Sequence, residues 1–239
     1  MPSPRLARLA GVLYLLTFVT SIPALALKTP LLTDPASAAA AGPARWAGLL
    51  EIVLALACVG TAVALYPLTS RVAPAAALGF VASRVLEGAL VLVGVMALLA
   101  LAAAATASGA ADADTGTAAA AAADPLAGAL VALHDQAFLL GPGLLPAVNA
   151  VLLGGVLWRG RLVPRIIPLV GLIGAPVLAA SAVASLFGVL PQVSPLAGLA
   201  ALPIALWELA IGLWLTFRGL RLSAASPTGT TGTSAPRRG

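Results

Sequence analysis

The longest apolar stretch of the chain, residues 75–105, contains only two charged side chains, Arg84 and Glu87. An α-helix of about 20 apolar residues crosses the hydrocarbon core of a bilayer. Only a helix or a closed barrel satisfies its backbone hydrogen bonds there, and this stretch is too long and continuous for a barrel strand. It therefore predicts a transmembrane helix.

The composition extends this interpretation to the whole chain. Of 239 residues, 61% are hydrophobic and 9% are charged, against roughly 25% charged in an average soluble domain. Such a chain cannot cover a globular surface with polar groups, so we predict an all-α, polytopic integral membrane protein. Its single domain, residues 1–222, has six expected spans, at about residues 6–27, 46–68, 75–105, 129–158, 168–190 and 196–217. A tail, residues 223–239, is expected to be disordered.

Two segments between the expected spans have the composition of loops. Residues 28–44 are rich in Pro, Ala and Thr, which is typical of a loop. Residues 106–128 are Ala-rich and of low complexity, which favours a flexible linker. Within them, residues 112–116 faintly resemble a calcium-binding loop but lack the later ligands and the distal Glu.

The first apolar run allows two interpretations. Arg5 and Arg8 precede it, and it ends in Ala24-Leu25-Ala26, a plausible signal-peptidase site. The run is long for the apolar part of a signal peptide, and more spans follow it. A retained first helix is therefore favoured over a cleaved one.

The basic residues between the runs indicate an orientation. One side of the membrane receives Arg5, Arg8, Arg71, Arg159, Arg161, Arg165, Arg218 and Arg221, and the other receives Lys28 and Arg45. The positive-inside rule then predicts that both termini lie in the cytoplasm, in a multi-pass protein of a bacterial plasma (inner) membrane. Basic residues spread in this way are topology signals, and they argue against nucleic-acid binding.

Six acidic, basic or histidine side chains fall in the interior of the expected spans: Glu51, Arg84, Glu87, His134, Asp135 and Glu208. Each charge at the centre of a bilayer costs about 2.5–3.5 kcal/mol. We therefore expect these side chains to face inward, along rows of small residues, and to meet in one buried polar cluster in the middle to outer half of the bundle.

The role of such a cluster remains open between two hypotheses. It could be a salt-bridge knot around Arg84 that fixes the helix packing, or a site that binds a solute or a proton. Intramembrane ionisable residues are functional candidates by default, which favours the second hypothesis. One arginine cannot neutralise several carboxylates, so Glu51, Glu87 or Glu208 could carry a proton.

The only histidine, His134, has three possible roles: a capped histidine near the surface, a proton relay with Asp135, or a metal ligand. A lone histidine makes a poor metal site. The single cysteine, Cys58, excludes an intrachain disulfide and makes a structural zinc site improbable. No metal or cofactor is therefore expected.

The fourth expected span is interrupted in the middle by Gly141, Pro142, Gly143 and Pro146. Pro removes a backbone donor and Gly loosens a helix, so we expect a kink or a break. A simple kink is the commoner outcome, whereas in transporters an interrupted helix presents free backbone groups to a substrate. Asn149 could then satisfy freed carbonyls or contact a ligand.

The chain contains no nucleotide-binding or common hydrolase motif, which disfavours nucleotide-driven work. The leading hypothesis is a membrane protein that binds or moves a small solute or protons through the polar cluster. The alternatives are an intramembrane enzyme acting on a lipid or quinone-like substrate, with His134 and a carboxylate as acid and base, and a non-catalytic partner of another membrane protein.

Five stretches carry a family resemblance: residues 5–17, 80–88, 132–143, 161–176 and 207–214. In these stretches the chain resembles a bacterial six-helix membrane protein family known as domain of unknown function 4386, especially its actinobacterial members. The resemblance implies a six-span integral membrane protein. It brings no established activity, so it assigns no catalytic residue.

Overall fold

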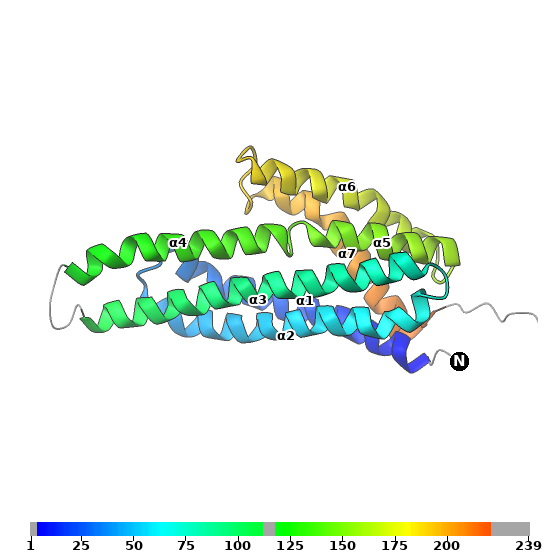
Figure 1. The fold of residues 1–239 in the computed structure, drawn as a ribbon, viewed down its shortest axis with the longest axis horizontal. Helices are drawn as coiled ribbons and strands as arrows, with labels where there is room; N and C mark the ends of the chain where they lie inside the picture. Colours follow the sequence, from blue (N-terminus) through cyan, green and yellow to red (C-terminus); the bar gives the residue numbers. More distant parts are fainter. Residues whose placement is uncertain (1–3, 112–117, 221–239) are drawn as a thin grey trace, which may run out of the picture.

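The computed structural model describes residues 4–111 and 118–220, and the described residues form helices and turns without a strand. Seven helices follow one another: α1 (Pro4–Thr33), α2 (Ala38–Thr69), α3 (Pro74–Ala111), α4 (Ala118–Leu140), α5 (Leu145–Gly160), α6 (Ile166–Leu186) and α7 (Pro195–Phe217). α4 and α5 lie end to end and together cross the bundle once (Figure 1). The described chain therefore has six spans long and apolar enough to cross a membrane, as the sequence predicts.

The expected loop at residues 28–44 shrinks to the short turn between α1 and α2. α1 continues past Lys28 because that side chain is buried against α2 rather than exposed to water. The hydroxyls of Thr29 and Thr33 donate to carbonyls of α1 itself, so these side chains bond along the helix. Proline and threonine content alone therefore misplaced this loop.

The expected linker at residues 106–128 is also shorter than predicted. α3 continues to Ala111 and α4 begins at Ala118. Alanine has the highest helix propensity of all residues, so low complexity here means helix rather than coil. The faint calcium-loop pattern at residues 112–116 and the tail at 223–239 lie outside the described residues.

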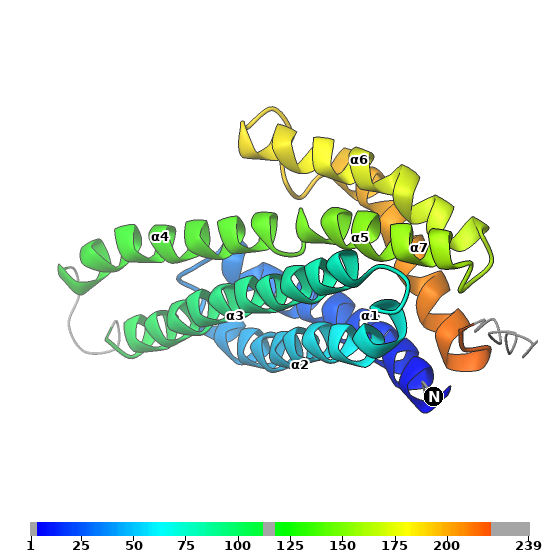
Figure 2. The same cartoon turned by 45° about the vertical axis from the view of Figure 1, so that its right-hand side comes forward.

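The helices pack around α1, α2 and α3, and small residues allow close approach. α1 lies between α2 and α7, and α6 lies between α5 and α7 (Figure 2). Gly11 on α1 sits against the backbone of α7 at Gly212 and Thr216. An apolar core that includes Tyr14, Phe80 and other buried side chains fills the half of the bundle near the N terminus.

A Gly171→Ala substitution should destabilise the fold at the contact between α6 and α7. A Cβ at this position would lie 2.7 Å from the ring of the fully buried Trp207. Overpacking of this kind costs about 1–3 kcal/mol. The matched control is Gly155→Ala, where a Cβ meets nothing within 4 Å and the higher helix propensity of alanine should be neutral or stabilising. Thermal unfolding of the solubilised variants checks this; equal unfolding temperatures would contradict the packing.

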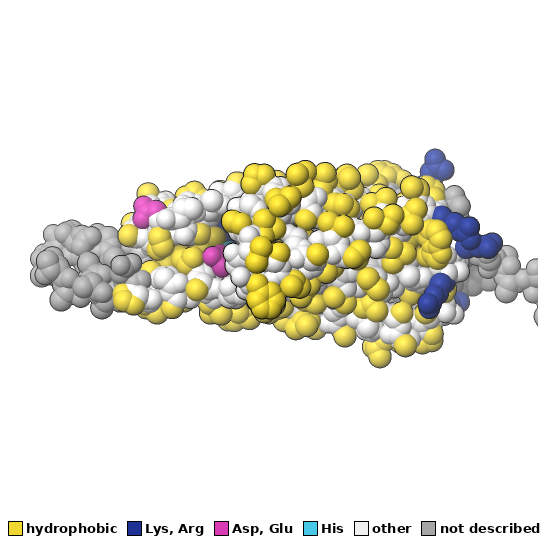
Figure 3. Space-filling view, turned by 90° about the horizontal axis from the view of Figure 1, so that it is seen from above, with side chains coloured by type: hydrophobic (Ala, Val, Ile, Leu, Met, Phe, Trp, Pro, Cys, Tyr) yellow, Lys and Arg dark blue, Asp and Glu magenta, His cyan; other side chains and the backbone are white. Residues whose placement is uncertain are grey.

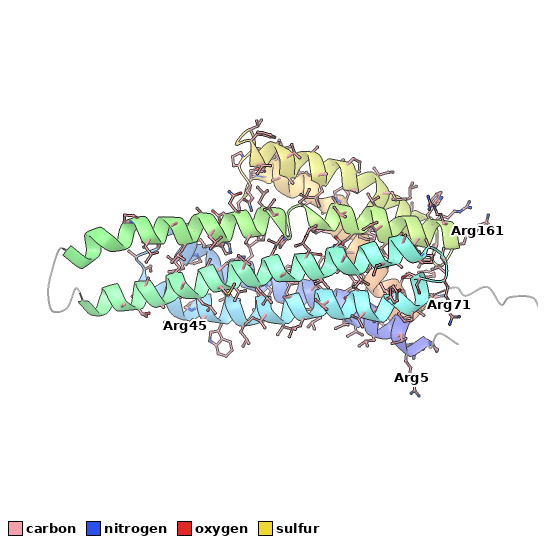
Figure 4. The ribbon with its side chains drawn as sticks, in the orientation of Figure 1. Arg5, Arg45, Arg71 and Arg161 are labelled. Carbon is pink, nitrogen blue, oxygen red and sulfur yellow. The ribbon has the colours of Figure 1, made fainter. Side chains whose placement is uncertain are left out.

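The two ends of the molecule differ in charge. Arg5, Arg71 and Arg161 lie at the end that carries the N terminus, whereas Arg45 lies in the opposite half (Figure 4). On the face seen from above, Lys and Arg gather at that same end, and acidic side chains show only toward the other (Figure 3). We call these the basic end and the far end.

α6 and α7, which form a hairpin, are shorter than α1, α2 and α3. α6 and α7 have 21 and 23 residues, or about 32–35 Å, close to the roughly 30 Å of a bilayer core. α1 and α2 have 30 and 32 residues, or about 45–48 Å, and they extend beyond the hairpin at the far end (Figure 1). The hairpin also diverges from α4 toward its own loop (Figure 2).

Candidate functional site

Arg84 lies at the centre of the bundle and is 2% exposed. It stands three residues before Glu87 on α3, so both side chains share one helix face. Arg84 Nη1 donates to Glu87 Oε2 at 2.9 Å. The guanidinium also lies over the ring of Tyr14 on α1, 4.9 Å from its centroid. The guanidinium is held in place by its charged hydrogen bond to Glu87 and by the aromatic face of Tyr14.

Glu87 accepts two hydrogen bonds at one carboxylate oxygen, Oε2. Besides Arg84, Asn149 Nδ2 donates to the same Glu87 oxygen at 2.7 Å. Asn149 lies on α5, just beyond the break between α4 and α5, and it is fully buried. The broken helix therefore supplies a neutral hydrogen-bond donor to a buried carboxylate.

Glu208 on α7 is the second carboxylate of this group, and it is less well compensated. Its Oε1 lies 3.5 Å from Arg84 Nη2 and has no hydrogen-bond partner among the described residues. Arg84 Nε and Nη2 are also without a hydrogen-bond partner there. Two carboxylates thus face one guanidinium. We call Arg84, Glu87, Asn149 and Glu208 the central group.

A cavity of about 210 Å³ adjoins the central group. Arg84, Glu87 and Glu208 all line it. Thr17 and Ser21 on α1 contribute hydroxyls, and the remaining lining includes Phe18, Leu54, Cys58, Pro142, Pro146, Leu178, Ala201, Ile204 and Ala205. The side chains of Arg84 and Glu208 therefore line a cavity, although their unpartnered atoms, Arg84 Nε and Nη2 and Glu208 Oε1, are themselves buried.

The other three predicted residues form a separate group farther from the basic end. Lys28 Nζ lies 2.5 Å from Glu51 Oε1 and 4.8 Å from the ring centroid of Phe138. His134 Nδ1 lies 3.1 Å from Asp135 Oδ1. Lys28, Glu51 and His134 border one small pocket. The structure therefore divides the six residues between two groups; Glu51, His134 and Asp135 join Lys28 in what we call the outer group.

Sequence reasoning missed Lys28 because residue 28 was placed in a loop. A signal was present in the spacing of the buried side chains of α1, where Lys28 continues the row of Ala24 and Leu31 at helical intervals. Its burial gives Glu51 a cation of its own, which explains why Glu51 does not reach Arg84. No three His, Cys, Asp or Glu side chains of the described ranges come together as a candidate metal site.

The helix interruption lies between the two groups. α4 ends at Leu140 and α5 begins at Leu145. Gly141 N donates to Ala137 O, and Leu145 N donates to Gly141 O, so the turn partly bridges the break. Pro142 lines both the cavity of the central group and the pocket of the outer group.

A family model matches this arrangement almost from end to end. The model of a domain of unknown function, DUF4386, matches residues 9–219. The chain belongs to the DUF4386 family. The matched region of this DUF4386 protein contains the central group, the outer group and the break between them. No curated protein and no solved structure matches the chain significantly.

In this DUF4386 chain, further cavities lie between the far end and the central group. A cavity of about 390 Å³, lined by Lys28, His134 and Asp135 among others, lies where α1 and α4 face the hairpin loop. It shares Phe138 and Gln192 with a mostly apolar groove of about 320 Å³ between α4, α6 and α7. That groove shares Pro142, Leu178 and Ala201 with the cavity at Arg84. A series of adjoining cavities thus extends from the far end to Glu208.

Proposed function

We propose that this multi-pass membrane protein carries a small solute across the bilayer together with, or in exchange for, a proton. In this proposal Glu208 carries the proton, and the cavity beside Arg84 holds the solute. The observation that supports it is the position of Glu208: it is the second carboxylate on a single guanidinium, its Oε1 has no hydrogen-bond partner among the described residues, and its side chain lines a cavity.

The charge balance of the central group explains why Glu208, rather than Glu87, would bind and release a proton or another cation. Glu87 has Arg84 and Asn149 as donors, so its charge is matched. If Glu208 is ionised as well, the central group has a net charge of −1. An uncompensated charge in such a place costs several kcal/mol, and binding a proton or a cation removes that cost. Glu208 is therefore suited to bind and release a positive charge.

The proposed orientation follows from the two ends of the molecule. The basic end would face the cytoplasm, with both termini there, and the far end would face the outside of the plasma membrane. The ion pair of the buried Lys28 with Glu51 reduces the free positive charge of the far end. The cavities that lead to Glu208 would then open outward, while the apolar core blocks the cytoplasmic side.

A Glu208→Gln substitution should abolish proton binding at this site. Wild-type proteoliposomes on a solid-supported membrane should give a transient current when the outside pH is stepped, because protons move into the bundle to Glu208. The Glu208→Gln protein should give only the current of empty liposomes, while Ala180→Phe, on the exposed face of α6, should match wild type. Equal currents from folded wild type and Glu208→Gln would refute the proposal.

A further inference from the structure

We infer that the transported solute is a hydrophobic organic cation, an ammonium group on an apolar body, and that it competes with the proton for Glu208. This inference rests on the proposed function and names its substrate class. The cavities provide two different environments for such a molecule: a carboxylate at the inner end, and an apolar groove leading to it.

The charge of the central group selects for a cationic head. With Arg84 at +1 and Glu87 and Glu208 at −1 each, a bound ammonium brings the group to neutrality, as a proton does. An anion would bring it to −2, in surroundings where each unmatched charge is costly. The acceptors are also present: Glu208 Oε1 has no partner in the described chain, and the hydroxyls of Thr17 and Ser21 line the same cavity. Phe18 adds an aromatic face, which attracts cations.

The groove beyond the central group suits an apolar body. Its lining includes Leu25, Leu139, Leu178 and Ala182, and the polar side chains among its walls are serines and Gln192 without a charge. Ala201 marks the point where the groove meets the cavity at Arg84. Seven residues of α7 separate Ala201 from Glu208, a rise of about 10 Å. A molecule with its ammonium at Glu208 and an extended alkyl chain of ten carbons would reach into the groove.

The rim of this groove suits a molecule that arrives from the membrane surface. The loop between α6 and α7, residues 187–194, carries no charged residue. Its side chains Phe187, Val189 and Val193 are 76%, 78% and 83% exposed. In the adjoining cavity of about 390 Å³, Asp135 is half exposed and adds a negative charge. An apolar rim and a carboxylate in the adjoining cavity match an amphiphilic cation at the lipid–water boundary.

Carbodiimide labelling of Glu208 tests whether the head group of the solute is positively charged. Dicyclohexylcarbodiimide adds to protonated carboxyl groups in apolar surroundings, and mass spectrometry of the protein in nanodiscs would follow its rate at Glu208. Decylammonium at ten times its Kd should slow the labelling roughly tenfold, since protection follows 1 + [L]/Kd. Decanoate, with the same chain and the opposite charge, and methylammonium, without the chain, should leave the rate unchanged at that concentration.

The outcomes separate this inference from the proposed function. If Glu208 is not labelled and the wild-type protein gives no pH-step current, the proposed function itself fails. If Glu208 is labelled but decylammonium gives no protection, or decanoate protects equally well, only the cation inference is overturned. If methylammonium at the same concentration slows the labelling of Glu208 equally, the alkyl chain does not contribute to binding and the groove has no role in it.

A filled groove provides the second test. Ala182 lines the groove and is 7% exposed, so a phenylalanine at this position should fill the groove. In Ala182→Phe, decylammonium should protect Glu208 about tenfold less well or worse, because its alkyl chain is no longer buried. Ala180→Phe, two residues away and exposed, should protect as wild type does. Unchanged protection in Ala182→Phe, with the pH-step current retained, would show that the solute does not use the groove.

Discussion

Replacement of Arg84 by methionine should lower the free energy of unfolding by about 3–5 kcal/mol, the usual cost of breaking a buried ion pair by removing one partner. Arg84 is the only cation within contact distance of Glu87 and Glu208 among the described residues. Without it, two carboxylates would share a buried site, and the Tyr14 ring would lose its cation. Thermal unfolding of the solubilised protein measures this effect.

The matched control for this prediction is Arg84→Lys. Lysine keeps the positive charge but lacks the planar fork that reaches Glu87 and Glu208 together, so an intermediate loss is expected. The double variant Arg84→Met/Glu208→Gln should recover part of the stability, because it removes one of the two stranded carboxylates. An Arg84→Met protein as stable as wild type would mean that the central group is not held together by this guanidinium.

Replacement of Lys28 by methionine should be similarly costly, about 3–5 kcal/mol, because it leaves Glu51 buried without its cation. The double variant Lys28→Met/Glu51→Leu should return close to wild-type stability, since a buried ion pair can be replaced by apolar side chains of similar volume at little cost. Thermal unfolding of the three proteins measures the coupling. A mild effect of Lys28→Met alone would place Lys28 in water, as a loop residue, and would contradict its position in the outer group.

The spans could be predicted from the sequence because hydrocarbon imposes a strict rule on composition. A run such as residues 75–105 has only one stable form in a bilayer, and its single pair of charges is spaced to meet on one helix face. The helix interruption at Gly141–Gly143 could also be predicted, because Pro and Gly act locally on the backbone. These features depend on neighbouring residues alone.

The pairing of charges across helices could not be predicted in the same way. Contact between Lys28 and Glu51 depends on α1 continuing past residue 28. The sequence pattern there, a charge next to Pro and Thr, predicts a loop instead. Contact of Asn149 with Glu87 depends on how α5 leaves the break, which the sequence does not specify. The division into a central group and an outer group therefore emerged only from the packing of the helices.

Modification of Cys58 most directly tests the central claim, that a cavity beside Arg84 and Glu208 is reached from the outside. Cys58 is the only cysteine of the chain and lines this cavity, with its Sγ 3.8 Å from Arg84 Nη1. In right-side-out membrane vesicles, the cationic reagent trimethylammonioethyl methanethiosulfonate, added outside, should modify Cys58. The anionic sulfonatoethyl reagent should react more slowly than the cationic one, by a larger factor than with a free thiol in solution, because Asp135 and Glu208 line the route. Failure of both reagents on the folded protein, or reaction only from the cytoplasmic side, would contradict the account.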